Sequence, residues 1–384
     1  MNVQASLWRS AAMRALVGVT VLGFASYCLT LASLPAYAVR GGAGEDTAGI
    51  VTAVLLTVTI AVQIVVPTLT ARFGQAPVLI AGLVALGAPS PLYALDDGLL
   101  WLSALSAVRG AGFAVLTVLG ATLAAQVAPV ERRGEAIGIY GLAIAVPNLV
   151  AVPAGVALVL DGHTTWLAVL AASPLVGLFF VPALARALPP AERRGPVGSG
   201  RTAALAALAP SVVLFVVTMA GGGLVTFLPI ERPDGALATA ALLLFGITGA
   251  LTRWRAGLLA DRWGSRRLLP LSLLVAAAGL VVVGAGLGRS DAWVLVGAAV
   301  FGAGFGAVQN LTLLSAFARA GEGGTTSASA MWNASFDAGT AAGALVLGMV
   351  AAAIGLSWTY VLVAALLAVA VPLASAAARV AVRS

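Results

Sequence analysis

Lysine is absent from this sequence of 384 residues, and all 21 basic residues are arginine. Without lysine, the chain has no Walker P-loop lysine, no Schiff base and no catalytic serine–lysine pair. Cysteine and histidine occur once each, as Cys28 and His163. An intrachain disulfide and a thiolate metal cluster are therefore excluded, and a single histidine makes no metal site. We expect no metal and no cofactor.

Charge is also scarce. Charged residues make up 9% of the chain, hydrophobic residues make up 61%, and the mean hydropathy is +1.05. An ordinary water-soluble domain has about 25% charged residues. The composition therefore predicts an all-α polytopic membrane protein. In such a protein the net charge of +7 is interpreted first as a marker of topology, and we do not expect a nucleic-acid partner.

Long apolar runs recur along the whole chain. The first run, about residues 15–38, ends in "LPAYA" and imitates a cleavable signal, but it exceeds the ~7–15 residues of a signal's apolar region and can span a bilayer. Windows of about 20 apolar residues separated by polar breaks predict twelve transmembrane helices. We place them near residues 14–39, 49–71, 77–95, 99–127, 135–160, 165–187, 205–229, 237–260, 268–287, 292–319, 325–354 and 357–379.

Arginine is distributed unevenly between the two sides of these spans. With the N-terminus inside, cytoplasmic segments hold fifteen arginines and outer loops hold three. The positive-inside rule then predicts a cell-membrane protein with both termini in the cytoplasm. The cytoplasmic set includes Arg132, Arg133, Arg193, Arg194, Arg262, Arg266 and Arg267, and the outer set is Arg40, Arg232 and Arg289.

The longest hydrophilic stretch, "LPPAERRGPVGSGR", separates the sixth span from the seventh. Its proline, glycine and charge are typical of a linker. We therefore predict two six-helix bundles, residues 1–187 and 205–384, joined by a cytoplasmic linker over 188–204.

The two halves resemble each other in sequence. "RFG" at 72–74 matches "RWG" at 262–264 with an offset of 190, "RGAGFA" at 109–114 matches "FGAGFG" at 301–306 with an offset of 192, and "LP" at 34–35 matches "LP" at 228–229 with an offset of 194. Three matches in order indicate an internal duplication. Parallel six-span repeats predict a site at the repeat interface near the bilayer midplane, reached alternately from each side.

The segment "GLLADRWGSRR" lies between the eighth and ninth spans. Gly257 allows two helices to approach closely, and Asp261 at the cytoplasmic rim can face the N-terminus of a neighbouring helix, with an arginine beside it to pair with. Such a cluster can latch one conformation. A basic loop alone would be only a topology marker. The ordered spacing of the motif residues Gly257, Asp261, Arg262, Gly264, Arg266 and Arg267, with twelve spans and a duplication, resembles the loop signature of the major facilitator superfamily of secondary transporters.

This resemblance covers essentially the whole chain and implies transport by alternating access. The first-half copy, "TLTARFGQAP", departs from the pattern, because Ala71 stands where the family commonly has the acid. The resemblance therefore implies a latch on one side only. Arg109, followed by "GAGFA", resembles the family's span-four arginine motif. The fifth span, with Pro147 and Pro153, loosely resembles a motif of family antiporters, although such residues are also common in helix packing.

Asp337 is the only acid in the interior of any predicted span. The corresponding position in the first half is Pro147, so the acid is not a packing requirement of both repeats. A buried carboxyl can reduce its energetic cost by taking up a proton, which is the chemistry of a proton-coupling site. We therefore predict that Asp337 and Arg109 couple transport to protons. The alternative is a fixed ion pair with Arg109, Arg253 or Arg255.

Other polar or aromatic residues at depth are candidates to line a substrate cavity, although interhelical hydrogen bonds explain any one of them equally well. They are Tyr27, Thr226, Gln309, Asn310, Asn333, Phe336 and Arg253. Their mostly apolar and aromatic character favours a small amphipathic organic substrate over a sugar or a multiply charged anion.

We expect a secondary active transporter, monomeric in the lipid bilayer, that exchanges protons for an exported amphipathic molecule of the drug, natural-product or metallophore type. The resemblance of "NxxFDxG" around Asp337 to facilitator exporters favours export. Proton-coupled uptake of a small organic nutrient or metabolite is the alternative. A membrane-embedded enzyme is disfavoured, because an aspartyl site needs two carboxylates and the span interiors offer one. A purely structural or receptor protein remains a third option, which predicts no transport.

Overall fold

The computed structural model describes residues 6–187, 199–231 and 236–379, and every regular element within these ranges is helical. Most of the predicted linker, with Arg193 and Arg194, lies outside the described residues, as does Arg232. The end of the linker forms the short helix α11 (Ser199–Ala206). The predicted all-α fold is confirmed.

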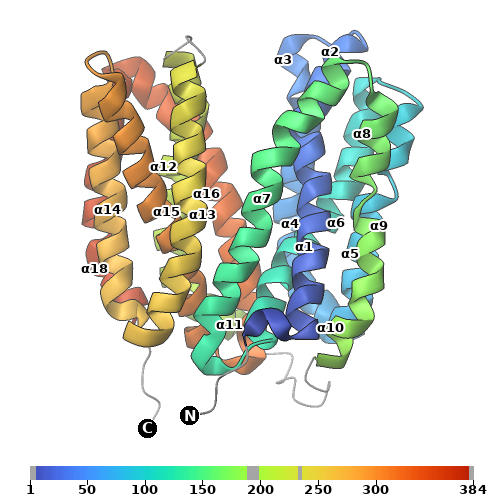
Figure 1. The fold of residues 1–384 in the computed structure, drawn as a ribbon, viewed down its shortest axis with the longest axis horizontal. Helices are drawn as coiled ribbons and strands as arrows, with labels where there is room; N and C mark the ends of the chain where they lie inside the picture. Colours follow the sequence, from blue (N-terminus) through green and yellow to red (C-terminus); the bar gives the residue numbers. More distant parts are fainter. Residues whose placement is uncertain (1–5, 188–198, 232–235, 380–384) are drawn as a thin grey trace. The chain divides into compact units, whose positions relative to one another are not determined.

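The chain divides into two compact units, which Figure 1 colours from blue to green and from yellow to red apart from the start of α7. The first unit comprises Met1–Ala128 and Ala143–Val197, and the second comprises Pro129–Leu142 and Gly198–Ser384. After the sixth span, the chain passes from the first unit to the second between Val197 and Gly198, which lie within the stretch predicted as the linker. The segment Pro129–Leu142 differs, because it groups with the second unit although it precedes the linker.

In the first unit, α6 (Leu99–Gln126) packs against α4 (Ile50–Phe73) and α5 (Gln75–Gly87). The first span is α1 (Ala11–Leu31) followed by α2 (Ser33–Arg40), and it contacts α6 and the broken sixth span. That sixth span consists of α8 (Thr164–Ala171), α9 (Pro174–Gly177) and α10 (Val181–Ala187), and the outer loop contains α3 (Glu45–Ala48). Helix α7 (Arg133–Leu160) contributes residues to both units.

In the second unit, α15 (Asp291–Ala320) packs against α13 (Ala236–Trp263) and α14 (Ser265–Gly286), and α12 (Leu208–Glu231) packs against α16 (Thr325–Ile354). The last elements are α17 (Leu356–Val369) and α18 (Val371–Ala377).

The described residues contain eleven helical segments that are long and apolar enough to cross a membrane, and there are twelve if the pair α17 and α18, bent by 40°, counts as one span. The break falls just before Pro372, which lies at the start of α18 and has no N–H to continue the helix. These segments match the predicted spans to within a few residues, which confirms the polytopic membrane fold.

The duplication is visible in the backbone of both units. Gly74, which ends α4, has φ 88°, and Gly264, which ends α13 at an offset of 190, has φ 76°. A Cβ at Gly110 would overlap the carbonyl oxygen of Leu55, and a Cβ at Gly302 would overlap that of Phe245. These two pairs are related by the same offsets of 190 and 192, so each repeat uses the same glycine to bring the same two helices into contact.

Candidate functional site

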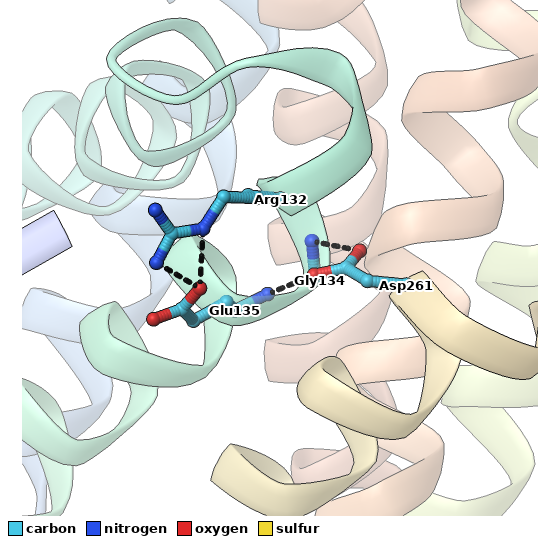
Figure 2. Close-up of polar contacts among 4 residues, drawn as sticks. All are labelled: Arg132, Gly134, Glu135 and Asp261. Carbon is cyan, nitrogen blue, oxygen red and sulfur yellow. Dashed lines mark hydrogen bonds and ion pairs between the residues drawn. The ribbon is translucent and has the colours of Figure 1, made fainter. Parts of the chain in front are cut away.

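The carboxylate of Asp261 caps the N-terminus of α7 (Figure 2). Its two oxygens accept hydrogen bonds from the backbone N–H of Gly134 at 2.9 Å and of Glu135 at 2.8 Å. These N–H groups belong to the first turn of α7 and have no acceptor within the helix, and the helix dipole favours an anion there. The structure therefore places Asp261 against a neighbouring helix N-terminus, as the rim motif predicts.

The arginine that forms an ion pair beside this contact comes from outside the rim motif. Arg132 contacts Glu135 through its NH2 group at 2.7 Å and through Nε at 2.8 Å. Arg262, Arg266 and Arg267 are exposed instead. Successive residues on a helix point about 100° apart, so Arg262 points away from α7 when Asp261 points towards it.

Three glycines of α7 form a close seam with α13. Gly134 packs against Gly257 so tightly that a Cβ at either position would overlap the other's carbonyl oxygen. A Cβ at Gly138 would lie 2.9 Å from the carbonyl oxygen of Trp254, and one at Gly141 would lie 2.6 Å from Nε of Arg253. The rim motif on α13 does not predict the part of α7 in this seam, although the sequence of α7 carries a signal for it. Its signal was the i, i+4, i+7 spacing of the glycines, which places them on one helix face.

Asn310 fastens the same seam from α15. Its Nδ2 donates to the carbonyl oxygen of Arg253 at 2.9 Å and to that of Gly134 at 3.3 Å. The side chain is fully buried. Asn310 was predicted as a possible cavity residue, and the contacts that the structure shows for it are with helix backbone.

Arg109 lies fully buried in α6, surrounded by neutral oxygen atoms. Its NH2 group donates to Thr30 Oγ1 at 2.9 Å and to both oxygens of Ser26 at 3.1 Å, and its NH1 group donates to Ser90 Oγ. The guanidinium also lies over the Tyr93 ring at 5.4 Å. An arginine at the centre of a membrane helix costs on the order of 2.5–3.5 kcal/mol on insertion scales, and hydrogen bonds to the charged group offset part of this cost.

Arg253 is the second buried arginine, with an exposed fraction of 8%. Its NH1 group donates to Oε1 of Gln309 at 2.9 Å, and the guanidinium lies 5.9 Å from the centre of the Trp332 ring. Across the described ranges, no carboxylate forms an ion pair with Arg109 or Arg253. Arg255, two residues further along α13, is exposed and lies over the Trp254 ring.

Asp337 lies on α16, twelve residues after its first residue Thr325, which is about 18 Å along the helix. Its side chain is partly buried. In the described parts of α7, α12, α13 and α15, every other acid lies within the first or last three residues of the helix. Asp337 is thus an acid in the interior of a span-length helix, away from its ends.

Residues around Asp337 form an aromatic and polar surface of α16. The rings of Trp332 and Phe336 stack with their centres 5.9 Å apart, and Trp332 Nε1 donates to Thr312 Oγ1 at 3.0 Å. Asn333 is buried, and its Nδ2 donates back to Ser329 one turn earlier. Phe336 and Asp337 are both partly exposed.

The remaining predicted cavity residues belong to different units. In the first unit, the Tyr27 ring stacks on the Phe113 ring at 3.8 Å between centres. In the second unit, Thr226 lies partly buried on α12. Within the second unit, the structure therefore brings Arg253, Gln309 and Trp332 together as one cluster, with Phe336 beside Trp332.

The family model of the Major Facilitator Superfamily matches residues 15–331 of this sequence. The chain belongs to the Major Facilitator Superfamily. It is therefore a multi-pass membrane transporter and not an enzyme, as the rim motif and the span count had indicated.

Solved structures of this superfamily share the fold at low sequence identity. The human organic anion transporter MFSD10 (TETRAN) is 16% identical with a TM-score of 0.75, over 97% of this chain and 100% of that one. The E. coli fucose:proton symporter FucP is 15% identical with a TM-score of 0.74, over 97% and 100%. The proton:xylose symporter XylE is 15% identical with a TM-score of 0.73, over 94% of each chain. A search of curated protein sequences finds no match.

Proposed function

We propose that this transporter is a proton-coupled antiporter that exports a small amphipathic organic molecule across the cell membrane by alternating access. The observation that carries this proposal is the position of Asp337: one partly exposed carboxylate at mid-depth in a 30-residue apolar helix. Such a carboxylate is tolerated most easily when it can be protonated, so a cycle that exposes it to each side in turn can move a proton.

The Asp261 contact supports a mechanism in which a conformation is held and then released. Two charge-assisted hydrogen bonds and the glycine seam fix the start of α7 to α13. Such bonds stabilise by about 1.5–3 kcal/mol each, which is enough to favour one state without making it permanent. We propose that this latch holds the state closed to the cytoplasm, with both termini on the cytoplasmic side and the protein acting as a monomer.

In the proposed mechanism, Arg109 contributes a fixed positive charge in the first unit of the protein. Its guanidinium is held by hydroxyl and carbonyl oxygens and by no described carboxylate. Coulomb attraction is stronger in a low-dielectric interior than in water, so a positive charge inside the membrane makes an ionised carboxylate there less costly. We therefore propose that Asp337 binds and releases the proton and that the charge of Arg109 favours its release.

The test is transport by purified protein in liposomes. Asp337→Asn removes the proton site but keeps the size and polarity of the side chain, so we expect gradient-driven accumulation to be lost while exchange of labelled for unlabelled substrate continues. Asp291→Asn makes the same change at the first residue of α15, a helix end, and should leave accumulation intact. Uphill transport by Asp337→Asn at the wild-type rate and pH dependence would show that Asp337 is not the coupling residue.

A further inference from the structure

Arg253 has hydrogen-bonding capacity that the protein does not use. It lies ten residues before the end of α13, about 15 Å from that end, and its side chain is 8% exposed. A guanidinium has five N–H donors in a planar fork, and the structure gives this one a single neutral acceptor, Gln309 Oε1. Its Nε is buried and has no acceptor.

The internal duplication supplies a comparison for this charge. At an offset of 190, Arg253 corresponds to Gln63, and at an offset of 192, Gln309 corresponds to Thr117. The two positions are bonded to each other in both repeats: Gln63 Nε2 donates to Thr117 Oγ1 at 3.3 Å, as Arg253 donates to Gln309. The fold is therefore compatible with a neutral side chain at this place, and the charge at Arg253 is an addition specific to the second repeat.

The face of α13 that carries Arg253 becomes exposed towards the N-terminus of the helix. Gly246, seven residues before Arg253 and so on the same face, is exposed, and a Cβ there would meet nothing within 4 Å. Towards the C-terminus of α13, Gly257 and Asp261 are packed against the start of α7. Gly249, one turn before Arg253, is buried, so the exposed part of this face ends two turns before Arg253, and a ligand would approach the guanidinium from that end.

A buried tryptophan ring and a partly exposed phenylalanine ring lie next to the guanidinium. Trp332 contacts Arg253 through its ring, and Phe336 stacks on Trp332 one turn further along α16. Phe336 is partly exposed. An anionic group bound at Arg253 would therefore continue into a molecular body that packs along two aromatic rings.

We propose that the transported substrate is an organic monoanion, a carboxylate or sulfonate on an apolar body, and that Arg253 binds its anionic group in the second unit. This proposal rests on the transport function proposed above and names its substrate class. Arg253 supplies a bidentate donor pair for two oxygens of the anion, Gln309 orients the guanidinium, and Trp332 with Phe336 accommodates the apolar body. Asp337 then serves the proton and does not bind a cationic substrate.

The experiment compares matched probes in liposomes that contain the full-length protein. The probes are octanoate, benzoate and 1-naphthoate, each with its neutral amide and its cationic amine of the same carbon skeleton. We expect the wild-type protein to transport at least one carboxylate about tenfold or more faster than its amide and amine, after subtraction of the rate in protein-free liposomes, because loss of a charge-assisted hydrogen bond costs about that factor.

Two variants should remove this preference by different routes. Arg253→Gln recreates the neutral side chain of the first repeat, and Gln309→Glu keeps the arginine but places a competing carboxylate beside it. Arg253→Lys should retain part of the preference, because it keeps the charge without the planar fork. Arg255→Gln, which removes an exposed charge two residues away, should change nothing.

The outcomes separate this inference from the function on which it rests. A wild-type protein that moves amides or amines as fast as every carboxylate, or an Arg253→Gln protein that keeps the carboxylate preference, would overturn the anion assignment. If the Arg253→Gln protein fails to fold, Gln309→Glu decides in the same way. If the wild-type protein accumulates neutral or cationic probes with the proton gradient and Asp337→Asn does not, the antiport function stands and the anion assignment is wrong.

Discussion

At the scale of single residues, the most unusual environment belongs to Arg109. Its acceptors come from two other spans: Ser26 and Thr30 from the first, and Ser90 from the third. The sequence predicts that an arginine within a span needs a partner, but it does not predict hydroxyl groups as that partner. Serine and threonine inside membrane helices commonly bond to their own helix backbone, so their residue type gives no sign of a longer-range role.

Removing one of these acceptors should be costly. Ser90→Ala deprives the Arg109 guanidinium of one hydrogen bond, and it also removes the bond that Ser90 donates to Ala171. We expect a loss of about 1–3 kcal/mol in the free energy of unfolding, measured by thermal or denaturant unfolding in detergent. Ser103→Ala on α6 is the control, because Ser103 Oγ is buried without a hydrogen-bond partner. Equal stability of the two variants would contradict the role given to Ser90.

Gly257 was predicted as a site of close helix approach, and the structure shows the partner, Gly134. Gly257→Ala should force the two helices apart and reduce turnover, at a cost of about 1–3 kcal/mol in the stability of the state that contains the seam. Gly246→Ala on the same helix is the matched control, since its Cβ would enter open space and alanine favours helix by up to about 1 kcal/mol. The measurement is turnover and thermal stability of both variants. Equal values for Gly257→Ala and Gly246→Ala would contradict the role given to the glycine seam.

At the scale of elements, the boundaries of the helices were largely predictable and their pairing was not. The apolar runs predict ends at residues 71 and 260, and α4 and α13 end two and three residues later, just before Gly74 and Gly264. A residue with positive φ ends a helix and is best occupied by glycine. The seam between α7 and α13 was only half visible. The rim motif indicates an acid that faces a helix N-terminus, but spacing along one helix does not identify which other helix lies against it.

The cap that Asp261 forms on α7 should be measurable as protection from hydrogen exchange. Asp261→Ala removes the acceptor of the Gly134 and Glu135 N–H groups, so exchange in the first turn of α7 should accelerate by about tenfold or more, as loss of a charge-assisted hydrogen bond implies. Arg262→Ala, at the adjacent exposed residue, should leave exchange unchanged. The cap would be refuted if mass spectrometry found the same α7 exchange in both variants and the wild type.

At the scale of the whole molecule, the two repeats share their packing and differ in their chemistry. Glycine contacts and helix-ending turns coincide at the repeat offsets. Four ionisable groups do not coincide: Arg109 corresponds to Phe301, Arg253 to Gln63, Asp337 to Pro147 and Asp261 to Ala71. The offsets needed for this comparison were present in the sequence, and applied to every buried polar residue they would have singled out Arg253. The bond between Arg253 and Gln309 required the structure.

The proposed exchange should also respond to membrane potential. If a monoanion leaves the cell as one proton enters, each cycle moves two positive charges inward, and each charge gains about 2.3 kcal/mol per 100 mV of inside-negative potential. Symport of a monoanion with one proton would move no net charge. Coupling to protons is therefore the point on which the account depends.

The most direct test is to record the proton itself. Liposomes containing the protein and a luminal pH-sensitive dye, with the membrane potential clamped by potassium and valinomycin, receive a transported substrate on the outside. Antiport carries substrate in and protons out, so the lumen should become alkaline with the wild-type protein and stay constant with Asp337→Asn, after subtraction of protein-free liposomes. A lumen that turns acidic would indicate symport, and substrate entry without any change in luminal pH would contradict proton coupling altogether.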